Sequence, residues 1–181
     1  YHKVAFNIVD YYSDVKFASA GYVMPVKDIG LMSISFSSIN YGDFDLTDEL
    51  ANEIGTFSAN EQLISLGFGK QIFENINIGL NMKTLFSNLE SYSSIAVSSD
   101  LALAYVNPAN NLAFSVLARN IGRQITSYTD QKENLPFQLD LGVSKSLDHL
   151  PFRFVLGYKN LQNFDLTYQN EFSTTLLNED G

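Results

Sequence analysis

The segment INIGLNMKTLFS, residues 76–87, sorts its side chains into two sets with a period of two. Successive side chains of a β-strand point to opposite faces, whereas a helix would scatter both sets around its axis. The segment therefore predicts a strand that separates an apolar environment from a polar one. The apolar set is Ile76, Ile78, Leu80, Met82, Thr84 and Phe86, and the opposite set is Asn77, Gly79, Asn81, Lys83, Leu85 and Ser87.

The same alternation recurs along the rest of the chain and predicts about nine strands. Each is long enough to cross a bilayer at a tilt, for which about 9–11 residues suffice. With 181 residues, the chain predicts one domain over 1–181. We expect an all-β fold, an antiparallel up-and-down transmembrane β-barrel of the outer-membrane type. The predicted strands are 2–10, 14–24, 29–40, 61–73, 76–87, 93–106, 111–122, 135–147 and 151–162.

The predicted connections alternate in length along the chain. Short turns at 25–28, 74–75, 107–110 and 148–151 alternate with longer polar stretches at 41–60, 88–92, 122–134 and after 163. Short turns on one rim and long loops on the other are typical of outer-membrane barrels. Two alternatives stay open, namely a self-contained eight-stranded barrel and a soluble β-sandwich.

Charge and side-chain chemistry narrow the function classes. The formal net charge is −9, which argues against nucleic acid as a partner. The longest apolar run, 101–106, is far too short for a helical membrane span. There is no cysteine, and the two histidines, His2 and His149, lie at a chain end and in a short turn. No nucleophile, metalloprotease or phosphate-loop motif occurs, so we expect no enzyme activity and no cofactor.

The polar face and the lysines fit a barrel wall. Ser, Asn, Gly and Gln dominate the polar face, which suits a lumen better than the solvent face of a soluble sheet. Lys70 and Lys145 interrupt the apolar face near the short-turn rim. A long lysine side chain can reach the headgroup region from such a position.

The longer loops contain the candidate contacts for a partner protein. In 41–60 these are Asp43, Phe44, Asp45 and Phe57, and the second group is Tyr128 and Asp130. Asp43, Asp45, Asp48 and Glu49 could also supply oxygen ligands to calcium, although they lack the spacing of an EF-hand. A solvated acidic loop is the simpler reading, and we predict no metal site.

Several segments resemble the PorV/PorQ group of FadL-like outer-membrane barrels, which belongs to the type IX secretion system. They include FNIVDYYSDVKF at 6–17, GTFSANEQLISLGFGKQI at 55–72 and LPFQLDLGVSKSLDHLPFRF at 135–154. The resemblance implies a larger barrel of about fourteen strands, of which this chain would be the middle. It also implies an outer-membrane location with the long loops outside the cell.

The resemblance further implies a non-enzymatic function in protein secretion and cell-surface attachment. The barrel would anchor a surface partner through its extracellular loops. PorZ-like proteins are the expected partners, together with PorU-like and PorV-like proteins, membrane lipids and lipopolysaccharide. The alternative function is FadL-like transport of small hydrophobic molecules across the outer membrane.

Overall fold

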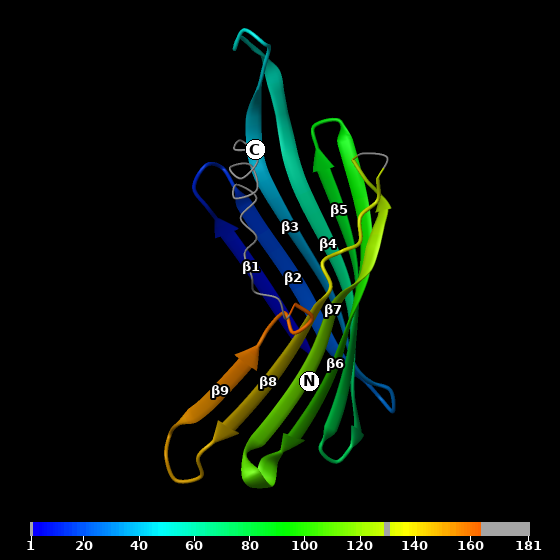
Figure 1. Ribbon diagram of the computed structural model, residues 1–181, viewed down its shortest axis with the longest axis vertical. Helices are drawn as coiled ribbons and strands as arrows, with labels where there is room; N and C mark the ends of the chain where they lie inside the picture. The colour runs from blue at the N-terminus through cyan, green and yellow to red at the C-terminus, as the bar shows by residue number, and fades with distance from the viewer. Residues whose placement is uncertain (1, 129–130, 164–181) are drawn as a thin grey trace, which may run out of the picture.

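The described part of the chain forms one antiparallel β-sheet of nine strands in chain order, as the computed structural model shows (Figure 1). The structure describes residues 2–128 and 131–163. The nine strands confirm the predicted all-β class and the predicted number of strands. A 3-10 turn at Pro108–Asn110 is the only helical element in the described ranges. The strands are β1 Lys3–Asp10, β2 Lys16–Val26, β3 Gly30–Thr47, β4 Glu53–Phe73, β5 Ile76–Leu89, β6 Tyr92–Asn107, β7 Leu112–Thr126, β8 Gln138–Ser146 and β9 Arg153–Tyr158.

The strand register aligns the two alternating sets into two faces of the sheet. Ser35 lies opposite Ser65, which lies opposite Lys83, and this row belongs to the polar face. In the neighbouring row Phe68 lies opposite Leu80, and Leu80 opposite Leu101. The period of two in the sequence therefore predicted the division of the sheet correctly.

The sheet curls, and its polar face is the concave one. The buried residues in the described part of the chain are Ala59, Ser65, Ser94, Ala96 and Asp140. By strand alternation all five belong to the polar face, because curvature crowds the side chains on the inner side. The described chain contains no second sheet packed against the first. A soluble β-sandwich, which requires two packed layers, is therefore not what these residues form.

Three of the predicted loops are shorter than expected. β3 continues to Thr47 and β4 begins at Glu53, so 41–60 is largely a two-stranded extension. β5 and β6 are joined by a tight turn after Leu89, and β7 extends to Thr126. Polar and small residues suggested loops here, but cross-strand pairs can hold such residues in strands. We call residues 43–58 the β3–β4 ribbon. The end of the sheet that carries it is the upper rim, and the opposite end is the lower rim (Figure 1).

Candidate functional site: an apolar convex face and a protruding ribbon

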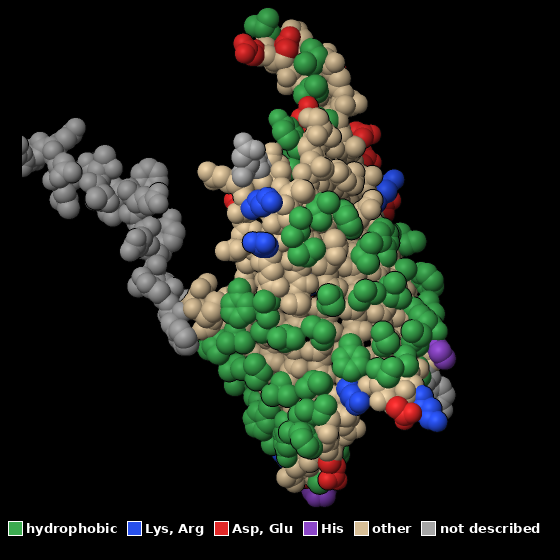
Figure 2. Space-filling view, turned by 90° about the vertical axis from the view of Figure 1, so that its right-hand side faces the viewer, with side chains coloured by type: hydrophobic (Ala, Val, Ile, Leu, Met, Phe, Trp, Pro, Cys, Tyr) green, Lys and Arg blue, Asp and Glu red, His purple; other side chains and the backbone are tan. Residues whose placement is uncertain are grey.

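The convex face of the sheet is apolar and exposed. Met82 is 59% exposed, Leu66 53% and Leu101 50%, although all three lie in the central part of their strands. Other exposed members of this face are Val4, Phe6, Ile8, Met32, Ile34, Phe36, Leu103, Phe114, Val116, Leu141, Phe154 and Leu156. Figure 2 shows hydrophobic side chains gathered across the middle and lower part of one side of the molecule. An apolar surface of this extent is rare on a soluble monomer.

Two lysines mark the lower border of the apolar face. The Nζ atom of Lys70 donates a hydrogen bond to the backbone oxygen of Asp28, 3.2 Å away. The Nζ atom of Lys145 likewise donates to the backbone oxygen of Asn110. Both ammonium groups therefore point to turns of the lower rim. This confirms that the two lysines lie at the short-turn rim, as the sequence predicted.

A β-bulge in β7 builds a polar network on the concave face. The register shifts between Ser99 and Leu101, and Asn120 adopts a left-handed backbone with φ of 55°. Its backbone nitrogen donates to Oδ1 of Asp100 at 2.9 Å. The same carboxylate lies 2.7 Å from Nζ of Lys83, which also donates to Oδ1 of Asn120 at 2.8 Å. The bulge thus completes a cluster in which every charge has an opposite partner.

A second ion pair continues the network toward β8. Nη2 of Arg119 lies 3.2 Å from Oδ2 of Asp140. Oδ1 of Asp140 accepts hydrogen bonds from Nε2 of Gln138 at 2.9 Å and from the backbone nitrogen of Asn160 at 3.3 Å. These residues were not predicted as a cluster. In the sequence, only Asn120 indicated an irregular backbone at this point of β7, since asparagine tolerates a left-handed backbone better than most residues.

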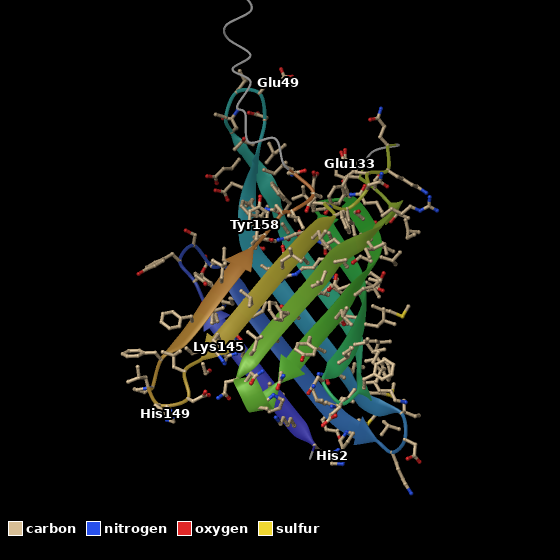
Figure 3. All side chains as sticks on the ribbon, turned by 60° about the horizontal axis from the view of Figure 1, so that its bottom comes forward. His2, Glu49, Glu133, Lys145, His149 and Tyr158 are labelled. Carbon is tan, nitrogen blue, oxygen red and sulfur yellow. The ribbon has the colours of Figure 1, made fainter. Side chains whose placement is uncertain are left out.

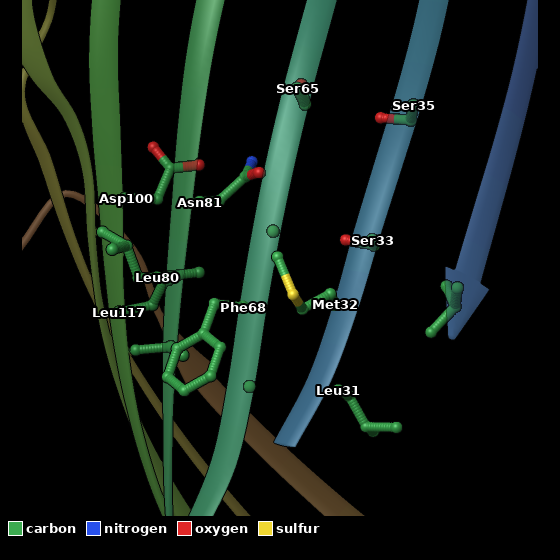
Figure 4. A pocket seen from close by; sticks show the side chains of 15 residues that line it. Leu31, Met32, Ser33, Ser35, Ser65, Phe68, Leu80, Asn81, Asp100 and Leu117 are labelled. Atoms are coloured by element: carbon green, nitrogen blue, oxygen red, sulfur yellow. The ribbon is translucent and has the colours of Figure 1, made fainter. Parts of the chain in front are cut away.

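A groove of about 480 Å³ lies beside this network on the concave face (Figure 4). Small side chains leave the space open, among them Ser33, Ser35 and Ser65. Asn81 and Asp100 add polar groups to the wall, and Val23, Leu31 and Leu117 add apolar ones. The groove therefore has a mixed wall, in which polar side chains lie beside bulky apolar ones.

The β3–β4 ribbon contains four of the six predicted partner-binding residues. Phe44 and Phe57 lie opposite each other, and their rings stack with centroids 5.3 Å apart and an interplanar angle of 22°. Asp43 and Asp45 flank Phe44, so strand alternation places their side chains on the other face of the ribbon. The ribbon thus presents an aromatic face and an acidic face.

The other two predicted residues are not part of the ribbon. Tyr128 follows β7, and its hydroxyl donates to Oγ of Ser87 at 2.5 Å. Oγ of Ser87 donates in turn to Oε1 of Glu61 at 3.3 Å, below the ribbon on the concave face. Asp130 lies outside the described residues. The structure therefore does not bring Tyr128 together with the four ribbon residues.

The acidic tip of the ribbon is organised as a turn. Oδ1 of Asp48 accepts hydrogen bonds from the backbone nitrogens of Leu50 at 2.9 Å and Asn52 at 2.8 Å, and Oδ2 accepts from Nδ2 of Asn52 at 3.0 Å. These hydrogen bonds lower the pKa of Asp48, with the side chain of Asn52 the largest cause. Among the described residues no three acidic or histidine side chains converge as metal ligands.

Figure 3 places Glu49 at the far tip of the ribbon and Glu133 on the same upper rim. His2, Lys145 and His149 lie toward the opposite end. Nδ1 of His2 is 2.6 Å from the hydroxyl of Tyr22, and the two rings stack. Neither histidine lines the concave groove.

Comparisons of the chain with protein-family models, with curated proteins and with solved structures find no match. Within 2–128 and 131–163, no helix is long and apolar enough to span a bilayer. The resemblance described above therefore remains a prediction from the sequence.

Proposed function

We propose that the nine strands form part of the wall of an outer-membrane β-barrel. The observation that carries this proposal is the exposed apolar convex face opposite a polar concave one. On β5 the apolar row runs from Ile76 to Phe86, about 33 Å at roughly 3.3 Å per residue. A strand tilt of about 40° reduces this to a height of about 25 Å, the height of the apolar band of such barrels. Lipid would cover the convex face, and the concave face would line the lumen.

The proposed function is non-enzymatic anchoring of a surface partner in type IX secretion and cell-surface attachment. The ribbon supports this proposal because it extends beyond the strands on either side of it. Its stacked phenylalanines and its carboxylates are contact groups that a barrel wall does not need. The upper rim would face the cell exterior. Surface proteins resembling PorZ, and those resembling PorU or PorV, are the proposed partners.

The test is to shorten the ribbon and measure the surface partner. Residues 44–57 are replaced by Asn-Gly, which closes a two-residue hairpin. We expect the barrel to stay in the outer membrane while a PorZ-like protein is lost from the cell surface. A matched control replaces Glu74 and Asn75 on the lower rim by Asn-Gly and should retain the partner. Equal partner levels in the two variants would refute the anchoring function.

Transport of small hydrophobic molecules is the second function that the sequence allowed. The concave groove provides space for a ligand of moderate size. Its wall includes apolar side chains, among them Leu31 and Leu117, but its serines, Asn81 and Asp100 are a poor match for an acyl chain, because burying their polar groups without partners is unfavourable. We therefore rank transport below anchoring. Uptake of a fluorescent fatty acid by vesicles that contain the full protein would reverse this ranking.

A further inference from the structure

The β3–β4 ribbon has two backbone edges that no described strand covers. β2 accompanies β3 only as far as the pair of Lys16 and Asn40. β5 accompanies β4 only as far as the pair of Leu89 and Ala59. Beyond these points β3 and β4 pair only with each other among the described strands. A strand edge with free amide and carbonyl groups is a template for another strand.

One hydrogen bond shows which backbone groups face outward on β4. The backbone oxygen of Ser58 accepts from the backbone nitrogen of Glu90, 3.2 Å away, and therefore points to the side of β5. Backbone direction repeats every second residue in a strand, so the N–H and C=O of Thr56 point to the same side. Gly55 and Phe57 point instead toward β3. Thr56 thus presents both hydrogen-bonding groups at the open edge.

The two edges of the ribbon differ in how well they are protected. The β3 edge carries Asp43 and Asp45, and charged side chains on an edge discourage unspecific strand pairing. The β4 edge has no charged residue and no proline between Glu53 and Glu61. Ile54 on this edge is 62% exposed. The β4 edge is therefore the better acceptor for an added strand.

The charge of the ribbon specifies the kind of strand that fits. Between Lys27 and Lys70 the sequence has no Lys, Arg or His. The acidic residues in that interval are Asp28, Asp43, Asp45, Asp48, Glu49, Glu53 and Glu61. Thr56 lies opposite Asp45 and Ser58 opposite Asp43, so the side chains of each pair share a face. A strand added beside β4 would place its side chains next to Thr56 and Ser58 and close to both carboxylates.

We propose that the open β4 edge, residues 54–57, binds a protein partner by strand addition. The partner supplies an extended segment with Lys or Arg at every second position, facing Asp43 and Asp45. Its backbone pairs with Thr56, and its cationic side chains provide selectivity and salt dependence. The inference rests on the proposed anchoring function and specifies how the partner is recognised.

The test measures binding of a defined peptide to the full chain in detergent micelles. The probe is a fluorescein-labelled peptide of seven residues that alternates valine and lysine, followed by fluorescence anisotropy. We expect saturable binding that weakens with salt. A peptide with glutamate in place of lysine, and one N-methylated at the amides that would face β4, should each bind at least tenfold more weakly. The N-methylated peptide tests strand addition without altering the protein.

A pair of variants locates the binding edge. Thr56→Pro removes the outward N–H and should weaken peptide binding at least tenfold, whereas Thr56→Val keeps the N–H and should bind like the unchanged protein. Equal affinity for the N-methylated and unmodified peptides would overturn strand addition. A protein dimer that Thr56→Pro dissociates, with no peptide binding, would assign the edge to a second copy and overturn the partner proposal.

The two proposals fail in different ways. If shortening the ribbon releases the surface partner but Thr56→Pro retains it, strand addition is wrong and anchoring stands. If shortening the ribbon leaves the partner in place, anchoring itself is wrong.

Discussion

Replacing Leu101 by arginine places a charge in the middle of the apolar convex face. Leu101 lies opposite Leu80 on β5 and Ala118 on β7, within the proposed lipid-facing belt. The adjacent residue on β6, Ala102, points to the concave face and lines the groove near Asp100. Leu101→Arg and Ala102→Arg therefore introduce the same side chain at neighbouring positions but on opposite faces of one strand.

The expected magnitudes differ by environment. Leu101 is already 50% exposed, so in water its replacement forfeits at most about 1 kcal/mol of apolar burial. On the lipid face of a barrel, arginine near the bilayer midplane costs about 2–4 kcal/mol. Ala102→Arg enters an open groove whose wall includes Asp100 and should cost less than about 1 kcal/mol. A difference of about 2–3 kcal/mol between the variants changes the ratio of folded to unfolded protein by roughly 30- to 150-fold.

The assay is reversible unfolding by guanidinium chloride in phospholipid vesicles. The midpoint should fall for Leu101→Arg and stay near that of the unchanged protein for Ala102→Arg, with the same slope for all three. Equal costs for the two variants would refute the assignment of the convex face to lipid. A cost below about 1 kcal/mol for Leu101→Arg would refute it as well, because that is the effect expected in water.

Three further predictions concern the concave network, one close backbone contact and the ribbon tip. Lys83→Met leaves the Asp100 carboxylate without its cation, with side chains only 17% and 16% exposed. Lys83→Met should lower the free energy of unfolding by about 2–4 kcal/mol. The double variant Lys83→Met with Asp100→Asn should regain more than half of that loss when the variants are compared in a double-mutant cycle. Gly122→Ala places a Cβ atom 2.0 Å from a backbone oxygen of β6. It should cost about 1–3 kcal/mol in the same assay, whereas Gly55→Ala, with no atom within 4 Å, should cost less than about 0.5 kcal/mol. The pKa of Asp48 lies below its ordinary value of 3.8, so its hydrogen bonds stabilise the turn above pH 3.8 and are lost as the pH falls through the lowered pKa. An NMR titration of the Asp48 carboxyl carbon with a midpoint at or above 3.8 would contradict this last prediction.

Strand positions were predictable because the side-chain period of a strand is visible in the sequence. The prediction of 76–87 agrees with β5 at Ile76–Leu89 to within two residues. The register of the sheet adds that polar positions of one strand lie opposite polar positions of the next. Ser65, for example, lies opposite Ser35 on one side and Lys83 on the other. A two-faced sheet therefore follows from alternation alone.

The ribbon could not be predicted in the same way. A register shift between Asn40 and Asp43 interrupts the alternation where β3 passes beyond the rest of the sheet. The pairing of Phe44 with Phe57 depends on that shift, and neither residue alone signals a strand. The bulge at Asn120 is a second case, because the contact with Asp100 joins residues on neighbouring strands. Bulges change which side chains meet, and a single sequence carries little trace of them.

The most direct test of the membrane assignment is a single-cysteine scan of 76–87 in membranes. The chain has no cysteine, so each introduced thiol reports on one position. Spin labels at these positions are tested for collision with oxygen, which concentrates in lipid, and with a water-soluble nickel chelate. If the convex face meets lipid, oxygen should reach the labels at Ile76, Ile78, Leu80 and Met82, and nickel should reach those at the intervening Asn77, Gly79 and Asn81. Equal nickel accessibility at all positions, in a protein that stays soluble without detergent, would contradict it.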